Sequence, residues 1–324
     1  MKNIDLTTNT NSHKDGKYLV SAIVSVYNCE RFIAGCLQDI ENQTIADKTE
    51  IIIVNSGSQQ NEKVIIRRFQ EKYNNIIYLK TANRESIYKA WNIGIKAASG
   101  KYITNANADD RHRKDSFEIM TSIFENNDNI DLIYADYIAT RTENETFEDC
   151  TPIGYAHLID SVNQSLLLDR GWIGCQPMWR KEIHDNFGYF DENLEIAGDY
   201  EFWLRISETC TFYHVNELLG LYLYNPESAE RRDYEKTATE VIDVLTRYIH
   251  KIKNNSQLEN IVKKKLSLKY SDLGYYYLKK RRNFEAIQIC LKGIKSDHSI
   301  LSNYKILLAS YAPYRLLKLL KIFQ

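Results

Sequence analysis

The sequence predicts an α/β fold, in which helices flank a mostly parallel β-sheet, followed by a C-terminal helical appendage. Two patterns support this prediction. Up to about residue 140, short apolar runs rich in β-branched residues alternate with segments of helical periodicity. Such alternation is typical of βαβ units, whose strands pair in parallel and are covered on both faces. After residue 228, every periodic segment is helical.

The elements can be placed in order along the chain. Residues 1–17 are polar and are predicted to form a flexible tail. The next strands are predicted at residues 19–26, 50–54, 76–79, 101–105 and 131–139. The helices between them are predicted at residues 30–42, 61–73, 86–98 and 116–126. Because right-handed crossovers align the ends of parallel strands, we expect a ligand site at the carboxyl edge of the sheet.

The alternation breaks near residue 150. A helix is predicted at residues 199–208, and strands around it at residues 172–179, 212–215 and 218–224. The helices that follow carry more basic than acidic residues. The predicted domains are therefore a flexible tail at residues 1–17, an α/β domain at residues 18–228 and a basic helical region at residues 229–324.

Charge and cysteine content narrow the class of protein. The formal net charge is −1 over 324 residues, yet residues 229–324 carry 20 Lys and Arg against 9 Asp and Glu. The six cysteines include no CxxC pair, which argues against a disulfide scaffold and a cysteine-based zinc site. No apolar run is long enough for a transmembrane helix, and the polar N-terminus does not read as a signal peptide. We therefore expect a cytoplasmic protein.

Polar side chains follow two of the predicted strands. Asn55 and Ser56 come directly after the second strand, where small polar residues let a ligand approach the backbone closely. Asp109 and Asp110 follow the fourth strand, and adjacent carboxylates at a sheet edge are stabilised by a divalent cation. A polar turn, a helix cap, or ion pairs with the neighbouring arginines would explain the same residues without any ligand.

Asp199 and His112 are two further titratable candidates. Asp199 follows Gly198 at the start of a predicted helix, so it is either a helix cap or a general base held by the helix start. His112 follows the acidic pair, within reach of a bound diphosphate or metal, but a lone loop histidine is expected to face solvent. Considered singly, each of these signals favours a structural explanation.

The order of these motifs resembles that of family 2 glycosyltransferases with the GT-A fold. The resemblance covers about residues 18–228, and residues 229–324 match no motif of the family. Matching segments lie at residues 23–28 (IVSVYN), 42–44 (NQT), 54–58 (VNSGS), 87–103, 107–110 (NADD) and 188–205. Each segment is short, and it is their combination in the family's order that makes the resemblance specific.

The resemblance implies an inverting transferase that moves a sugar from a nucleotide diphosphate sugar, with UDP favoured, to a hydroxyl of a glycan or lipid-linked acceptor in polysaccharide biosynthesis. Asp199 would be the catalytic base that takes the proton of that hydroxyl. Asp109, with Asp110, would bind a divalent cation, Mg²⁺ or Mn²⁺, that neutralises the leaving diphosphate. Tyr27 would stack on the base. The implied nucleotide-binding residues are Ser25, Val26, Tyr27, Asn55, Ser56, Lys89, Asn92, Asn107 and Ala108.

Two departures from the family pattern leave alternatives open. Asn107 stands where the metal motif has its first aspartate, which lowers the charge offered to a cation. Asn55 and Ser56 stand where many relatives have two aspartates, so guanosine and thymidine remain alternatives to uridine. A degenerate member that only binds nucleotide or glycan, or a nucleotidyltransferase, is the alternative function. Residues 27–30 lack the basic, glycine-rich phosphate loop that a nucleotidyltransferase requires, and no strand is followed by the GxGxxG of a dehydrogenase.

The last residues combine basic and apolar side chains. Residues 314–323 (YRLLKLLKIF) have the composition of an amphipathic helix that lies on an anionic membrane. Packing against the rest of the protein would produce the same pattern. The expected partners are a nucleotide-sugar donor, a glycan or glycolipid acceptor and, on the first alternative, the inner face of the cytoplasmic membrane. No nucleic acid partner is expected, because no RNA- or DNA-binding motif accompanies the basic residues.

Overall fold

The computed structural model describes residues 4–6 and 17–311, except residues 161, 171–172, 227 and 253. Contacts divide the chain into two compact units. The first, the α/β unit, comprises Met1–Asn163 and Trp172–Asn225, and the second, the helical unit, comprises Gln164–Gly171 and Pro226–Gln324. In this division, residues 164–171 group with the helices instead of the sheet.

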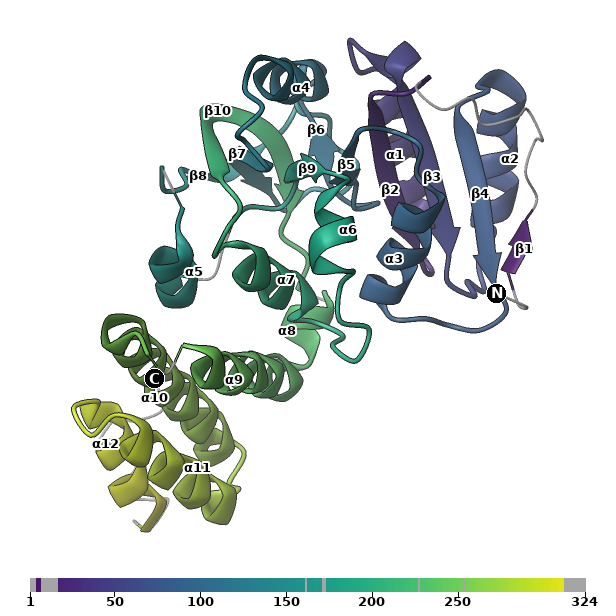
Figure 1. The fold of residues 1–324 in the computed structure, drawn as a ribbon. Helices are drawn as coiled ribbons and strands as arrows, with labels where there is room; N and C mark the ends of the chain where they lie inside the picture. Colours follow the sequence, from purple (N-terminus) through teal and green to yellow (C-terminus); the bar gives the residue numbers. More distant parts are fainter. Residues whose placement is uncertain are drawn as a thin grey trace. The chain divides into compact units, whose positions relative to one another are not determined.

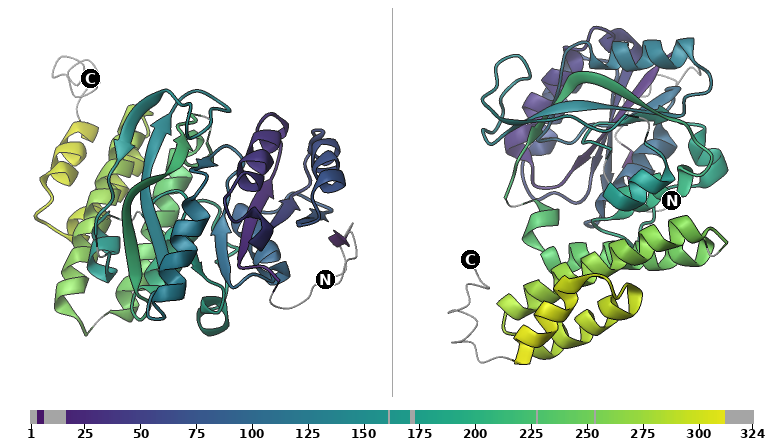
Figure 2. Two further views of the ribbon diagram at one scale, coloured as in Figure 1. Left: turned by 90° about the horizontal axis from the view of Figure 1, so that it is seen from above. Right: turned by 90° about the vertical axis from the view of Figure 1, so that its left-hand side faces the viewer.

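In the described part of the chain, ten strands form one sheet in the α/β unit (Figures 1 and 2). The strands are β1 (Ile4–Leu6), β2 (Val20–Val26), β3 (Thr49–Asn55), β4 (Ile76–Thr81), β5 (Tyr102–Asn105), β6 (Arg111–His112), β7 (Leu132–Thr140), β8 (Pro152–Ala156), β9 (Met178–Arg180) and β10 (Phe212–Leu223). Their order is β1-β4-β3-β2-β5-β9-β7-β10-β6, and β8 pairs with β7. The pairs among β4, β3, β2 and β5 are parallel, as is the β7–β10 pair, which confirms the predicted α/β class.

Alternate residues of β2 and β3 pack against helices on opposite faces of the sheet. The first four long helices are α1 (Glu30–Glu41), α2 (Glu62–Lys72), α3 (Ile87–Ala97) and α4 (Ser116–Asn126). Val24 and Ile53 lie in one core cluster with apolar side chains of α1, α2 and α4. Ile23 and Val54 instead meet α3, where a Cβ added to Gly94 would lie 2.6 Å from Ile23. Strands buried on both faces explain the continuous apolar runs in the sequence.

The second half of the sheet differs from the prediction. The predicted strands at residues 212–215 and 218–224 form one strand, β10, whose register against β7 shifts near its middle. The predicted strand at residues 172–179 is reduced to β9, which runs antiparallel to β5 and β7. Two residues account for the shortening. Gly174 has φ +86°, which is turn geometry, and Pro177 has no N–H to donate to a neighbouring strand.

The helical unit contains α5 (Gln164–Arg170), α8 (Ala229–Arg232), α9 (Tyr234–Lys251), α10 (Ser256–Lys279), α11 (Asn283–Ser296) and α12 (Leu301–Tyr311). Small residues let the last three helices approach closely, since a Cβ added to Gly274 would lie 2.6 Å from Cys290 Sγ. The side-chain amide of Gln164 donates to the hydroxyl of Tyr248, which joins α5 to α9. Over the described residues, no helix is both long and apolar enough to cross a membrane. The predicted membrane-binding residues 314–323 lie outside the described part.

Candidate functional site

Three parallel strands end at one edge of the sheet. β2 pairs with β3 so that Val26 lies opposite Asn55, and with β5 so that Ile23 lies opposite Asn105. The turns after these strands therefore lie next to one another, at the carboxyl edge where a ligand site is expected. Val26 packs its side chain into the core, while its carbonyl oxygen accepts a hydrogen bond from the backbone N–H of Ser56 at 2.8 Å.

Asn55 and Ser56 hold the turn after β3 in place. Asn55 is 2% exposed, and its Oδ1 accepts a hydrogen bond from the backbone N–H of Ser58 at 2.9 Å. The hydroxyl of Ser56 donates to the carbonyl oxygen of Glu85 at 3.0 Å and accepts from the Glu85 N–H at 2.5 Å. Gly57, which follows Ser56, has φ +67°, a conformation that suits glycine. The turn is thereby tied to the segment that leads into α3.

An aromatic ring and a guanidinium group face each other at this edge. Tyr27 directly follows β2 and is half-buried, as is Ser25 on the strand itself. The guanidinium carbon of Arg84 lies 4.2 Å from the centre of the Tyr27 ring. Arg84 was not identified as a site residue from the sequence. The one indication there is that a basic residue follows the third predicted strand. A flat ring opposite a cation provides a surface on which a nucleobase can stack.

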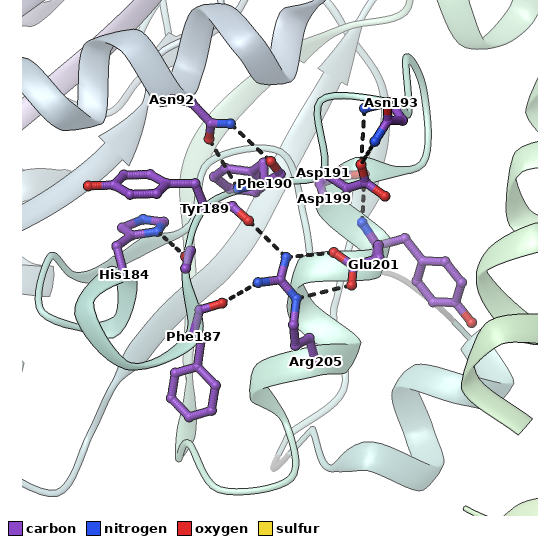
Figure 3. Close-up of polar contacts among 12 residues, drawn as sticks. Asn92, His184, Phe187, Tyr189, Phe190, Asp191, Asn193, Asp199, Glu201 and Arg205 are labelled. Carbon is purple, nitrogen blue, oxygen red and sulfur yellow. Dashed lines mark hydrogen bonds and ion pairs between the residues drawn. The ribbon is translucent and has the colours of Figure 1, made fainter. Parts of the chain in front are cut away.

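Lys89 and Asn92 lie on α3. The ammonium of Lys89 pairs with the carboxylate of Glu85 at 2.6 Å and remains substantially exposed. Asn92 is 1% exposed and is bonded within the protein: its amide donates to Phe190 O at 2.9 Å and to Glu192 Oε1 at 3.0 Å. Its Oδ1 accepts from the Phe190 N–H at 3.0 Å (Figure 3). Both amide hydrogens of Asn92 therefore bond to the 188–194 segment and join it to α3. This structural role was not predicted from the sequence.

The turn at residues 107–110, here called the acidic turn, contains one buried and one half-buried carboxylate. Asp110 is 2% exposed, and its two oxygens accept hydrogen bonds from Asn107 Nδ2 at 3.0 Å and from the Leu223 N–H at 3.1 Å. Asp109 is half-buried. The amide of Asn107 thus donates to Asp110, which an aspartate at position 107 could not do. Ala108 is 7% exposed, so it offers a ligand little beyond its backbone.

Burial dominates the electrostatics of the acidic turn. Desolvation, reinforced by the negative charge of Asp109, raises the pKa of Asp110 to about 8. Desolvation also raises the pKa of Asp109, although its backbone hydrogen bond and the positive charges of Arg111 and Arg31 oppose the shift. Two such carboxylates are stabilised by a cation. Among the described residues, no group of three or more His, Cys, Asp or Glu side chains is arranged to hold a metal ion. A cation at Asp109 would therefore take most ligands from phosphate or water, as Mg²⁺ commonly does.

Asp199 reaches the carboxyl edge through a contact with Tyr88. Asp199 is the second residue of α7 (Gly198–Ile206), and its Oδ1 accepts a hydrogen bond from the Tyr200 N–H at 2.7 Å. The Tyr88 hydroxyl lies 3.0 Å from the same oxygen, and its one proton is shared with the carbonyl oxygen of Ile196 at 2.6 Å. Tyr88 belongs to the first turn of α3, which begins at this edge of the sheet. Burial, and then the charge of Asp199, raises the pKa of Tyr88, so its hydroxyl stays protonated and can donate. Gly198 is required here, because a Cβ would lie 2.6 Å from the Tyr88 ring.

The helix that carries Asp199 is anchored along its length. The guanidinium of Arg205 pairs with Glu201 at 2.7 Å and donates to the carbonyl oxygens of Tyr189 at 2.9 Å and of Phe187 (Figure 3). On the buried face, Trp203 packs among the aromatic rings of Trp179, Phe190 and Phe202. These contacts fix α7, and with it the position of Asp199 in the first turn, where the helix dipole favours a carboxylate.

A small cavity lies behind the acidic turn. Its lining includes His112, Phe117, Gln176 and Gly220, and neither Asp109 nor Asp199 belongs to it. The expectation that His112 faces solvent is wrong: the side chain is 4% exposed, and its Nδ1 lies 3.1 Å from Asp39 Oδ2. The reason is that residues 111–112 form β6, which pairs with β10 and carries the histidine into the interior.

Comparison with known proteins gives consistent matches. Residues 21–174 match the family model described as Glycosyl transferase family 2. The chain is 26% identical over 208 residues to an uncharacterized glycosyltransferase, MJ1057, of Methanocaldococcus jannaschii, covering 64% of this chain and 71% of that protein. It is 27% identical over 229 residues to the uncharacterized glycosyltransferase EpsJ of Bacillus subtilis, covering 68% of this chain and 66% of that protein.

Solved structures share the fold. The structure of S. aureus TarS 1-349 in complex with UDP-GlcNAc gives a TM-score of 0.67 at 14% identity, over 90% of this chain and 89% of that one. The mannosyltransferase PcManGT from Pyrobaculum calidifontis, in complex with GDP-Man and Mn²⁺, gives 0.58 at 14% identity, over 96% of this chain and 87% of that one. Fold and sequence together define a glycosyltransferase with a GT-A fold. The family model matches just under half of the chain, and the relatives found over the same region are glycosyltransferases, which together support assignment to glycosyl transferase family 2. The family match ends before α7, so it does not cover Asp199.

Proposed function

We propose that this protein transfers a sugar, with inversion, from a nucleotide diphosphate sugar to a hydroxyl of a glycan or lipid-linked acceptor. One observation carries the proposal. The bond from Tyr88 brings the carboxylate of Asp199 to the edge of the sheet at which β2, β3 and β5 end. A family 2 fold with a separate carboxylate at that edge has both parts that a single displacement needs, a donor site and a base.

The nucleotide is assigned to the edge formed by Tyr27, Arg84 and the turn after β3. The base stacks on the Tyr27 ring, and the guanidinium of Arg84, 4.2 Å from that ring, moves aside or covers the base from the other face. UDP is favoured as the nucleotide. The support is a likeness in fold to a TarS structure that holds UDP and to another that holds UDP-GlcNAc. The GDP-Man bound in PcManGT keeps guanosine as the alternative base.

Asp109 would hold the divalent cation, Mg²⁺ or Mn²⁺. The buried carboxylate of Asp110 would add negative charge to the same site. The cation, when bound, would neutralise the charge that develops on the leaving diphosphate. The half-buried position of Asp109 and the raised pKa values of the acidic pair fit a cation site. Mn²⁺ in the PcManGT structure supports the same assignment. Asn107 keeps Asp110 oriented, which argues against the reading of position 107 as a mark of a degenerate member.

Asp199 would take the proton from the acceptor hydroxyl as the oxygen attacks the anomeric carbon. A sugar hydroxyl is a weak nucleophile until a carboxylate accepts its proton. The Tyr88 hydroxyl and the Tyr200 N–H both contact Oδ1 of Asp199, which orients the carboxylate. Since the base acts directly on the acceptor, no enzyme nucleophile is needed, and the anomeric configuration inverts.

The acceptor is assigned to the class of surface polymers or lipid-linked glycans. The support is similarity to two relatives, the Minor teichoic acid biosynthesis protein GgaB of Bacillus subtilis and the Hyaluronan synthase of Pasteurella multocida. This chain covers 14% of the first and 20% of the second. Attachment to the inner face of the cytoplasmic membrane through residues 314–323 remains part of the proposal.

A ligand screen with one variant tests this function. Thermal stability is measured with UDP, GDP and dTDP, and with their sugar conjugates, each with Mn²⁺ and with chelator. A rise with UDP or UDP-sugar that requires Mn²⁺ supports the donor site, whereas no response to any nucleotide contradicts it. Tyr27→Ala should then weaken the binding of the responding nucleotide roughly 5- to 100-fold, the loss expected for one base–aromatic stack. Val64→Ala, an exposed apolar residue on α2, serves as the control.

A further inference from the structure

A buried arginine lies directly beneath the acidic turn. Arg111 is 3% exposed, and its Nη1 donates to two backbone carbonyl oxygens of the turn, Ala108 O at 3.0 Å and Asp110 O at 2.6 Å. These carbonyls flank Asp109 on both sides in the chain. From the sequence, Arg111 was considered as an ion-pair partner of the carboxylates, but these bonds go to the backbone that holds them.

The same guanidinium is bonded to a loop from another part of the unit. Arg111 Nη2 donates to Asn144 Oδ1 at 3.0 Å, and Asn144 Nδ2 donates to the carbonyl oxygen of Arg31, on α1, at 3.0 Å. Asn144 lies between β7 and β8 and has φ +62°, a conformation that asparagine tolerates better than most residues. A continuous chain of hydrogen bonds therefore runs from α1 through Asn144 to the acidic turn.

Two further features accommodate Arg111: α1 leaves room for its guanidinium, and its backbone carbonyl oxygen is hydrogen-bonded. A Cβ added to Gly35 of α1 would lie 2.4 Å from Arg111 Nη2, so the helix has no side chain where the guanidinium passes. Gln176 Nε2 donates to the carbonyl oxygen of Arg111 at 2.8 Å, and Arg111 pairs with Leu221 in the sheet. Burying a cation is costly unless it is fully bonded, and here the planar guanidinium reaches three acceptors at once.

We propose that Arg111 is a positioning residue for the donor site: it fixes the backbone on both sides of Asp109 and couples it, through Asn144, to the loop at residues 141–151. The proposal rests on the proposed function in so far as Asp109 binds the cation of the donor complex. A lysine could replace the charge but not the geometry, because an ammonium is a point donor that cannot span Ala108, Asp110 and Asn144 in one plane.

Three variants disturb the network from different sides. Arg111→Lys keeps the charge and removes the planar fork. Gly35→Ala leaves Arg111 in the sequence but places a methyl group against Nη2. Asn144→Gly keeps the positive φ accessible and removes both side-chain bonds. The control for Arg111→Lys is Arg113→Lys, because the guanidinium of Arg113 bonds to Asp115 and Glu217. The control for Gly35→Ala is Gly154→Ala, where an added Cβ meets nothing within 4 Å.

The first readout does not depend on any ligand. Amide hydrogen exchange over residues 105–112, measured on the full chain without metal, should be roughly 2- to 10-fold faster in Gly35→Ala and Asn144→Gly than in the wild type. The controls should exchange at the wild-type rate. Unchanged exchange in both variants would overturn the proposal, and it would do so even if Arg111→Lys failed to fold.

The second readout measures the cation. Mn²⁺ binding in the presence of UDP, followed by the electron paramagnetic resonance signal of free Mn²⁺, should weaken roughly 10- to 100-fold in Arg111→Lys, as for outer groups that orient a metal ligand. Reversible unfolding raises the apparent dissociation constant only by the reciprocal of the folded fraction, so a variant that is mostly folded should show no comparable loss from destabilisation alone. Wild-type affinity in the folded variants would overturn the proposal. If the wild type binds no Mn²⁺ with UDP, the proposed function fails instead, and the exchange measurement still decides whether Arg111 holds the turn.

Discussion

The acidic turn and the start of α7 both present a carboxylate to the same edge, but they are supported in opposite ways. Around Asp109, the support acts on the backbone: Arg111 bonds to carbonyl oxygens, and Asp110 is tied to β10 through the Leu223 N–H. Around Asp199, the support acts on the carboxylate itself, through the Tyr88 hydroxyl. The difference suits two chemistries, since a cation site needs a fixed position and a base needs a defined oxygen that can exchange a proton.

The largest expected effect separates the two carboxylates by reaction step. Asp199→Asn should lower turnover by about 10²–10⁴-fold, because the acceptor hydroxyl loses its base, while Mn²⁺-dependent UDP affinity stays near the wild-type value. Turnover is measured as UDP released from the donor in the presence of an acceptor, and affinity by calorimetry. Near-normal turnover in this variant would remove Asp199 from the mechanism.

Asp109→Asn should produce the complementary result. The variant should lose roughly 10- to 100-fold or more in Mn²⁺-dependent nucleotide affinity, because it removes the half-buried carboxylate assigned to the cation. Nucleotide binding measured with chelator should be the same in wild type and variant. Equal Mn²⁺ dependence in the two proteins would show that the cation, if one binds, is held elsewhere.

A smaller effect tests the support of Asp199. Gly198→Ala places a Cβ 2.6 Å from the Tyr88 ring, so the helix start or the ring must move, at a cost of about 1–3 kcal/mol in the free energy of unfolding. Turnover should fall further than the loss of folded protein explains, since the Tyr88 bond to Asp199 is disturbed. Chemical denaturation measures the first effect. Gly154→Ala, which meets no atom within 4 Å, should change neither quantity.

The last expected effect concerns pH. The pKa of Asp110 is raised from 3.8 to about 8, so the folded state binds this proton more tightly than the unfolded state. Stability without metal should therefore fall as the pH rises from about 4 to about 8. In Asp110→Asn this contribution is absent, and the thermal midpoint measured in chelator should vary less with pH than in the wild type. An identical pH dependence in both proteins would contradict the raised pKa of Asp110.

The first half of the fold was predictable because its information is local. β2 and β3 are continuous apolar runs, and each is followed by the polar residues that end at the carboxyl edge. The second half depends on partners distant in sequence. β10 spans two predicted strands because its pairing with β7 tolerates a shift of register, and His112 is buried because β6 pairs with β10.

The candidate site shows the same division. Tyr27, Asp109 and Asp199 stand out by type and position, and their assigned roles remain predictions. Arg84 was not identified, and Arg111 was considered only as an ion-pair partner of the carboxylates, because a cation in the sequence does not reveal what it contacts. Arg84 lies over a ring from another strand end, and Arg111 bonds to backbone carbonyls. Asn92 was assigned to the nucleotide by its place in a motif, whereas its amide joins two segments of the fold.

The hydrogen bond from Asn107 to Asp110 has a consequence for the acidic turn. Asn107 Nδ2 lies 3.0 Å from Asp110 Oδ2, inside a site where Asp110 is 2% exposed. Restoring the aspartate of the family motif at position 107 would replace a donor with a second negative charge against a buried carboxylate. The two positions are therefore coupled: a change from Asn107 to the aspartate of the family motif would remove the amide donor from Asp110 and make the acidic turn depend more strongly on a bound cation.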